Sequence, residues 1–264
     1  MSLQRRTVST IDKYLDPEQI FKLICSKEWE YAVYNQQELS CRDRAMMALS
    51  FCSSGRITSV VGGPKYEKVG DDAVEVGYYE GLWTNNLSTT PSHIIVKNME
   101  VVKRSRKVIA KYGKRSQIRD DFVIPVKRGL YDNPYWDQFV PFGWLVLEYL
   151  VRYIGAKNRR LFPYERQRAW QIVNEVTGMF PNWFRAQAEH WYGHHIMADS
   201  VKLAAFVKVV RPEQIGHYIG YDWREQLKAK ELSVNFQWID PEIAKIRSRI
   251  ASSSPKILEN LQIL

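Results

Sequence analysis

The sequence predicts an α+β protein that is mainly helical and contains a small antiparallel β-sheet. Helix-start pairs such as Asp16–Pro17 stand before segments whose apolar residues recur at helical spacing. Two β-rich runs, HIIVKNMEVVKR and DDFVIPV, flank a basic segment and predict an antiparallel pair joined by a long turn. Of the 264 residues, 45% are apolar and 13% are aromatic, which is the composition of a globular protein.

Near the N-terminus we expect two helices that pack against each other. The first begins at Pro17 and carries apolar residues on one face, namely Ile20, Phe21, Leu23 and Ile24. The second runs from Arg42 to Cys52 and stops at Gly55, so that Arg56 lies just beyond its end. We interpret residues 1–264 as one domain, in which residues 1–41 form a helical lead-in.

Further along, the predicted elements differ in clarity. From Gly62 to Pro91 five glycines interrupt the pattern, so we expect loops with one or two strands and interpret residues 62–100 as an insertion. Residues 139–157 predict a buried helix that is too short to cross a membrane, and its aromatic residues are expected in the core. The segment YERQRAWQIVNEVTG predicts the next helix, closed by Gly178.

Residues 222–264 predict two more helices with helix-start pairs. Asp240–Pro241 is expected to open one and Ser254–Pro255 the other. The first has Ile243, Ile246 and Ile250 in register. The second is so apolar that it needs a surface to cover, its own domain or a neighbour's.

The charge of the chain points to a polyanionic partner. The formal net charge is +9, and eleven Lys and Arg against three acidic residues give the segment Lys97–Arg128 a net +8. Such a local excess favours nucleic acid, although a solvated basic face is the alternative. Three scattered cysteines predict neither disulfides nor a metal site, and no leader is apparent, so we expect a cytoplasmic protein without a membrane partner.

Three segments of the sequence resemble motifs of a known protein family. They are RDRAMMALSFCSSGRIT, LFPYERQRAWQIVNEVTGMFPNWFRAQ and FVKVVRPEQIGHY. In order and spacing, over roughly residues 42–220, they resemble the catalytic domain of the tyrosine recombinases (phage-type integrases), in particular archaeal-looking members. The resemblance implies the recombinase catalytic fold. It also implies a site-specific DNA recombinase, which cleaves and rejoins strands through a 3′-phosphotyrosine intermediate.

The resemblance assigns roles to residues of this chain. Tyr218 would be the nucleophile, and Arg56 and Arg185 would clamp the phosphate. Lys103 would protonate the leaving oxygen, with Lys111 and Lys114 as alternatives. No metal or other cofactor is required, because the bond energy is kept in the phosphotyrosine. DNA contacts are expected from the remaining basic residues of the turn and of the following helix, namely Lys107, Lys111, Lys114, Arg115, Arg119, Arg166 and Arg168.

Several positions depart from the family pattern. Asn182 stands where the family has the His of His-x-x-Arg, Val209 where it has a later His or Trp, and Ser59 where it has an acidic residue. Asn182 can still donate a hydrogen bond, whereas Val209 offers only packing. The activity is therefore expected to be weakened, and the alternative is a catalytically impaired DNA-binding protein on the same fold.

Other interpretations remain open from the sequence. A helical RNA-binding or structural protein would place Arg56 and Arg185 far apart, and a type IB topoisomerase would share the chemistry. His190 and His194 have the i, i+4 spacing of a zinc pair, but Trp191 replaces the Glu of metalloprotease helices, so surface histidines are expected. His217 or one of these could alternatively supply a hydrogen bond to the site. The resemblance also implies double-stranded DNA as the partner, self-association on DNA as a tetrameric synapse, and exchange of a C-terminal helix between protomers.

Overall fold

The structure is a computed structural model that describes residues 14–26, 37–69, 71–102, 118, 121–153, 158–197, 202–203, 206 and 234–253. In these residues the protein is an α+β protein, mainly helical, with two small antiparallel sheets, as the sequence predicts. None of the described helices is both long enough and apolar enough to pass through a lipid bilayer.

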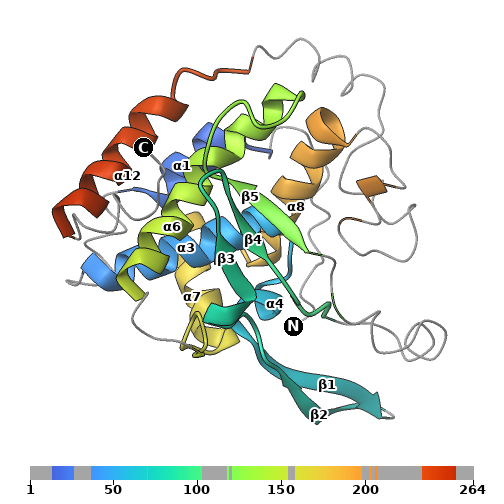
Figure 1. Cartoon of the computed structure of the whole chain (residues 1–264). Helices are drawn as coiled ribbons and strands as arrows, with labels where there is room; N and C mark the ends of the chain where they lie inside the picture. Colours follow the sequence, from blue (N-terminus) through green and yellow to red (C-terminus); the bar gives the residue numbers. More distant parts are fainter. Residues whose placement is uncertain are drawn as a thin grey trace.

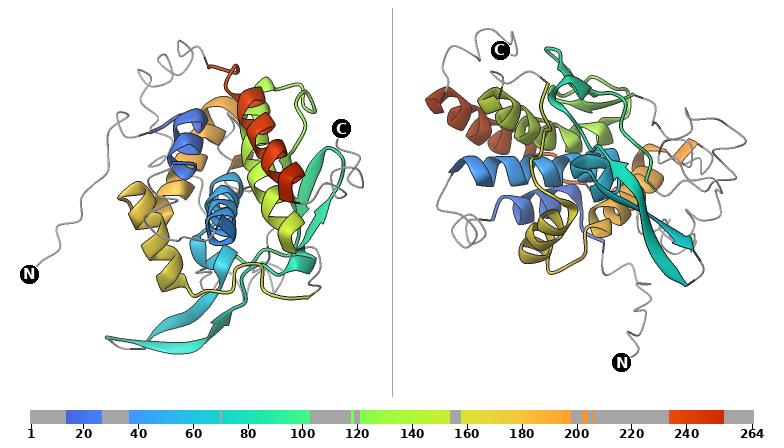
Figure 2. Two further views of the ribbon diagram at one scale, coloured as in Figure 1. Left: turned by 90° about the vertical axis from the view of Figure 1, so that its left-hand side faces the viewer. Right: turned by 90° about the horizontal axis from the view of Figure 1, so that it is seen from below.

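A central helix organises the core. Helix α3 (Gln37–Ser53) passes through the middle of the other helices in Figures 1 and 2, and its residues from Ala45 to Leu49 are completely buried. Around it lie the remaining described helices: α1 (Pro17–Ile24), α4 (Ile57–Val61), α6 (Val140–Tyr153), α7 (Arg166–Thr177), α8 (Asn182–Trp191) and α12 (Ile239–Ser253).

Helix α1 begins with a capping box and a proline, as its sequence predicts. The carboxylate of Asp16 accepts a hydrogen bond from the Gln19 amide, the Gln19 side chain accepts one from the Asp16 amide, and Pro17 occupies the first turn. Ile20, Phe21 and Ile24 are buried on the face toward α3 and α7. The predicted packing of this helix against the next one is therefore confirmed.

A three-stranded antiparallel sheet covers one side of α6. Its order is β3 (Leu87–Thr89), β4 (His93–Val96) and β5 (Phe122–Pro125), and β4 pairs with β5 as the two β-rich runs predict. A Cβ on Gly143 would lie 2.2 Å from the Pro125 carbonyl oxygen, so glycine is required where α6 approaches β5. The Trp144 indole donates to the Val126 carbonyl at 2.9 Å and fastens the same contact.

A second sheet stands away from the body. Strands β1 (Gly63–Val69) and β2 (Asp72–Tyr79) form a two-stranded antiparallel hairpin with a bulge at Lys65/Tyr66. Figures 1 and 2 show this hairpin projecting beyond the helices. The short 3-10 helix η2 (Thr84–Asn86) leads from it into β3.

The last described helix is held by an ion pair whose carboxylate is buried and whose arginine is half-buried. Arg249 of α12 donates from Nε and Nη2 to the two carboxylate oxygens of Glu148 on α6, at 2.8 and 2.7 Å. Glu148 is 2% exposed, and Ile246 and Ile250 are buried alongside. In Figures 1 and 2, α12 lies along α6.

Some sequence predictions need correction. Helix α3 begins at Gln37 and not at Arg42, and α12 begins at Ile239, so Asp240 lies in its first turn and does not cap it. The segment from Gly62 to Pro91 holds three strands, more than the one or two expected, because β1 and β2 pair in spite of their glycines. The predicted helix after Ser254 lies outside the described residues.

Candidate functional site

The junction between α3 and α4 places Arg56. Ser54 has a left-handed backbone, with φ of 49°, and ends α3, and a Cβ on Gly55 would lie 2.4 Å from the methyl carbon of Met99. The Gly55 amide donates to the Ser53 hydroxyl at 3.0 Å. The chain then turns into α4 with Arg56 as its extended N-cap residue. Arg56 thus lies just past the end of the central helix, as predicted.

Helix α8 carries the second predicted arginine. Asn182 is its first residue and is exposed, and Arg185 lies three residues further on, which places both on one face. One turn beyond, Glu189 is completely buried, and its Oε1 accepts from the Arg185 Nε at 2.6 Å. Trp183 and Phe184 are buried beside Arg185, whose side chain is 14% exposed.

The buried carboxylate of Glu189 pairs with one arginine and feels the charge of the other. Burial raises the pKa of Glu189, Arg185 opposes this most strongly, and the Ser54 hydroxyl and Arg56 oppose it less. The direct partner of Glu189 is therefore Arg185, and Arg56, from a distant part of the sequence, has a smaller electrostatic effect on it. The three groups together carry a net charge of +1 when Glu189 is ionised.

Packing of α8 on the central helix fixes this arrangement. The hydroxyl of Tyr192, the residue that follows α8, donates to the Cys52 carbonyl near the end of α3 at 2.6 Å. On another side of the helix the Gln187 side chain accepts from the Leu15 amide at 2.8 Å. Phe184 and Ala188 are fully buried between these contacts.

A second buried cluster lies on α3 ahead of the site. The Arg42 Nε is 3.5 Å from the Asp43 carboxylate, and its guanidinium stacks 4.7 Å from the centre of the Tyr164 ring. Burial raises the pKa of Asp43 to about 6, against the opposing effect of Arg42. This part of the Arg-Asp-Arg box therefore stabilises the contact of α3 with the segment before α7.

Most other predicted site residues lie outside the described residues. These are Tyr218, Val209, His217, Lys103, Lys107, Lys111, Lys114, Arg115 and Arg119. Strand β4 ends at Val96, ahead of Lys103. Of the predicted DNA contacts, Arg166 is exposed at the start of α7, and Arg168 is half-buried and donates to Gln171 at 3.1 Å. Ser59 is buried in α4.

The histidines follow Glu189 on a distorted helical turn. A π-helix, η5 (Tyr192–Ile196), continues α8, and the His190 and His194 rings lie 4.3 Å apart. Burial lowers the pKa of His195 to about 4, and His194 adds to the effect. Within the described part of the chain, no three His, Cys, Asp or Glu side chains gather where they could share a metal ion. All three histidines are half-buried, not fully on the surface.

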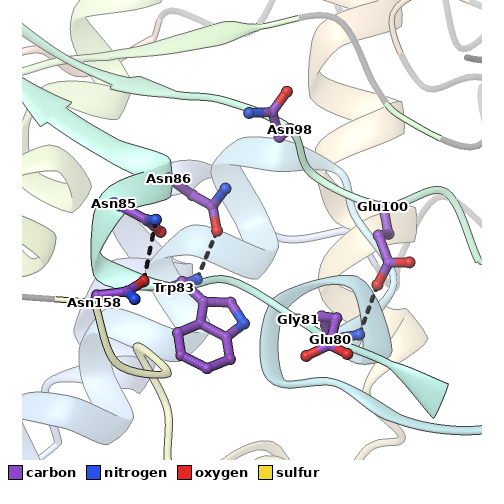
Figure 3. A pocket seen from close by; sticks show the side chains of 8 residues that line it. All are labelled: Glu80, Gly81, Trp83, Asn85, Asn86, Asn98, Glu100 and Asn158. Atoms are coloured by element: carbon purple, nitrogen blue, oxygen red, sulfur yellow. Dashed lines mark hydrogen bonds between the residues drawn. The ribbon is translucent and has the colours of Figure 1, made fainter.

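An open cavity of about 530 Å³ lies at the base of the β1–β2 hairpin, apart from the arginines. Figure 3 shows its lining, in which Asn85 donates to Asn158 and the Glu80 amide donates to Glu100. Trp83 and further amide groups complete it. Among the described residues the lining holds two glutamates and no cation, and this charge does not suit a phosphate.

Comparisons of the chain with protein-family models, with curated proteins and with solved structures found no match. The functional argument therefore depends on the site itself.

Glu189 is the residue that sequence reasoning missed. Its signal was present, because Arg185 and Glu189 have the i, i+4 spacing of a helical ion pair and lie among apolar residues. The electrostatic effect of Arg56 on Glu189 could not be predicted from nearby residues, since it depends on the packing of α8 against α3.

Proposed function

We propose that the protein is a DNA strand transferase of the tyrosine recombinase type. One observation carries the proposal: Arg185 pairs with the buried Glu189 carboxylate, and Arg56, the other arginine that the resemblance names, is near enough to lower the pKa of that carboxylate slightly. If the protein only bound RNA or had a structural role, no reason would exist for Arg56 and Arg185 to lie near the same carboxylate.

The chemistry of the cluster fits an anion with several oxygens. Each guanidinium is a planar fork of N–H donors, which suits an anion with several oxygens. Glu189 accepts from the Arg185 Nε, and a guanidinium carries four further N–H donors. Asn182, one turn earlier on α8, could add an amide donor.

The order of the elements also supports the proposal. Arg56 follows the central helix, a three-stranded antiparallel sheet comes next, and Arg185 lies on a helix that follows α6 and α7. This order resembles that of the recombinase catalytic domain.

In the proposed reaction, the Tyr218 phenol attacks the phosphorus of a DNA strand and displaces the 5′ oxygen. The proton of the phenol leaves to a base, and Lys103 donates a proton to the departing oxygen. The two arginines stabilise the charge that develops on the non-bridging oxygens. Attack by a free 5′ hydroxyl on the phosphotyrosine reverses the step, so the number of bonds is conserved.

We propose that the basic residues of the chain bind DNA. The segment Lys97–Arg128 carries a net +8, and Arg166 and Arg168 add positive charge on α7. Binding that depends on such residues weakens steeply as salt is added, because counterions are released from the DNA. Self-association on DNA, with exchange of the C-terminal helix, and a cytoplasmic location belong to the same proposal.

A DNA-binding protein that no longer cleaves is the second candidate. Val209 in place of His or Trp favours it, since loss of one donor to the transition state costs on the order of 10²- to 10³-fold in rate. It would keep the arginines and the basic segment as phosphate contacts only.

Trapping a covalent intermediate separates the two candidates. A duplex selected from a random library by binding to the protein would be nicked near the selected site, so that cleavage releases a short fragment and traps the enzyme. We expect a protein–DNA adduct that survives denaturation in wild type and is lost in Tyr218→Phe.

Two variants make the experiment specific. Tyr221→Phe removes a hydroxyl three residues away and should keep the adduct, whereas Arg185→Gln should lose it while the protein still binds DNA. A wild-type protein that binds the selected site without forming an adduct would favour the second candidate. Failure to select any DNA would reject both.

A further inference from the structure

The cavity at the base of the β1–β2 hairpin is built from three separate parts of the chain. Its lining residues come from the segments 80–86 and 98–100 and from Asn158 (Figure 3). The Thr84 amide donates to the Arg159 carbonyl at 2.9 Å and so joins the first part to the third. Its volume of about 530 Å³ lies within the range of small-molecule sites, about 300–1,000 Å³. The cavity is therefore a feature of the folded backbone and has the size of a ligand site.

The asparagine side chains of the lining keep hydrogen-bonding groups for a ligand. The Asn86 Oδ1 accepts from the Trp83 amide at 2.7 Å, which leaves the Asn86 Nδ2 as a donor. The Asn158 Oδ1 accepts from the Asn85 Nδ2 at 3.3 Å, which likewise leaves the Asn158 Nδ2. Within the described part of the chain the Asn98 side chain makes no hydrogen bond, so it offers both a donor and an acceptor. The lining thus presents amide donors and acceptors together.

Two carboxylates and an indole complete the lining. The Glu100 Oε2 accepts from the Glu80 amide at 2.7 Å, and the Glu100 Oε1 lies 3.6 Å from the Lys65 Nζ. The Glu80 carboxylate is exposed and pairs with no cation among the residues that the structure describes. Trp83 is half-buried and contributes an aromatic surface. The cavity therefore combines acceptors and an apolar ring with the amides.

The balance of these groups indicates the chemistry of the ligand. The carboxylates would repel an anion. A cation could pair with the carboxylates, but it carries donors only and would leave the amide N–H groups without acceptors. A hydroxyl group both donates and accepts, so several hydroxyls can satisfy the amides and the carboxylates at once. The C–H groups of a saturated ring carry a small positive charge, which suits the negative face of an indole.

We propose that this cavity binds a neutral sugar of one or two rings. The hydroxyls of the sugar would exchange hydrogen bonds with Asn86, Asn98 and Glu100, while one face of a ring packs on Trp83. Because backbone hydrogen bonds already fix the segments of the lining, binding would order few further groups. This inference is independent of the proposed function, because it involves neither DNA nor the two arginines.

Saturation-transfer NMR on the full chain tests the proposal. The probes are maltose, cellobiose, lactose, mannobiose and diacetylchitobiose, each measured alone. We expect at least one of them to bind with a dissociation constant of about 1 mM or lower, and the C–H protons of one ring face to receive the most saturation. Because the ligand is neutral, the dissociation constant should stay the same between about 0.05 and 0.5 M salt.

Two glycine substitutions remove amides of the lining without straining the chain. Asn98 and Asn158 both have a left-handed backbone, with φ of 55°, which glycine adopts readily. Asn98→Gly/Asn158→Gly should therefore keep the fold and raise the dissociation constant of the sugar at least about tenfold. A matched control, Gln167→Ala/Gln171→Ala, removes two exposed amides of α7 outside the cavity and should bind as wild type does.

Four results would overturn the proposal. None of the five sugars binds the wild-type chain, the glycine variant binds as tightly as wild type, or the control variant loses affinity to the same extent. The fourth concerns a cationic ligand, for which spermidine is the probe. Binding of spermidine that the glycine variant weakens, while no sugar binds, would assign the cavity to an amine instead.

Discussion

The Arg185 Nε lies 2.6 Å from the Glu189 Oε1, one turn further along α8, and Glu189 is completely buried. Arg56, at the junction of α3 and α4, has a smaller electrostatic effect and slightly lowers the pKa of the same carboxylate. Removing a partner from a buried ion pair leaves an uncompensated charge, which costs far more than removing an exposed one. The Arg185–Glu189 pair is therefore also expected to contribute to the free energy of unfolding.

We expect Arg185→Gln to lower the free energy of unfolding by about 3 kcal/mol or more, because Glu189 would lose its direct partner. Glu189→Gln should cost less, since a buried amide needs no counter-charge, and the double variant should be more stable than Arg185→Gln alone. Urea unfolding measures all three. Arg168→Gln, at a partly exposed arginine on α7, should change the stability by less than about 0.5 kcal/mol. Equal losses for Arg185→Gln and Arg168→Gln would contradict the buried pair.

Gly81 is predicted to be irreplaceable because of a close backbone approach. A Cβ there would lie 2.4 Å from the Gly62 nitrogen, which donates to the Thr58 carbonyl and so caps the end of α4. Gly81→Ala should cost at least about 3 kcal/mol, as strain and clash add. Gly129 has nearly the same φ, +69° against +70°, but nothing within 4 Å of a Cβ, so Gly129→Ala should cost only about 1 kcal/mol. Similar melting temperatures for the two variants would show that the clash is relieved.

Asp43 should make stability depend on pH. Its pKa rises from 3.8 in an exposed carboxyl to about 6 in the folded protein, so the folded state holds the proton more tightly. Its contribution is therefore greatest below pH 4 and is lost as pH rises to 6, by up to about 3 kcal/mol. Urea unfolding of wild type and Asp43→Asn at pH 4 to 7 measures it as the difference between the two curves. A constant difference would mean that Asp43 is ionised throughout.

His195 should act in the opposite direction. Burial lowers its pKa from 6.5 to about 4, so the folded state binds its proton less readily than the unfolded state. Stability from this group is present above pH 6.5 and is lost as pH falls toward 4. Thermal unfolding of His195→Gln should therefore decline less than wild type over this interval. Asp43→Asn is the comparison variant. Because Asp43 adds stability at low pH, its removal should make the melting temperature fall more steeply than that of wild type as the pH is lowered.

Sequence patterns predicted the elements whose signals are local. Asp16 caps α1 and Gly178 ends α7 with a left-handed backbone, because caps depend on a few neighbouring residues. The β1 and β2 strands were underestimated, since Gly63 and Gly77 appear as breaks in a sequence and yet fit the base of a bulged ribbon. The position of Arg56 was predicted as well.

Contacts between residues that are far apart in the sequence could not be predicted. Arg56 influences Glu189 across the packing of α8 on α3, which the Tyr192 hydrogen bond to the Cys52 carbonyl helps to hold. The π-helix η5, which follows α8, likewise has no simple sequence pattern. The roles of Tyr218 and Lys103 stay predictions, because both lie outside the described residues.

The contact between Gly55 and Met99 has a further consequence for how the protein would meet a ligand. This contact and the Tyr192 hydrogen bond fix the backbone on either side of Arg56 and at the end of α8, so an anion bound there would meet backbone that is already ordered. The conformational entropy of aligning the cations is already lost in the free protein, so each captured oxygen would strengthen binding with little loss of freedom.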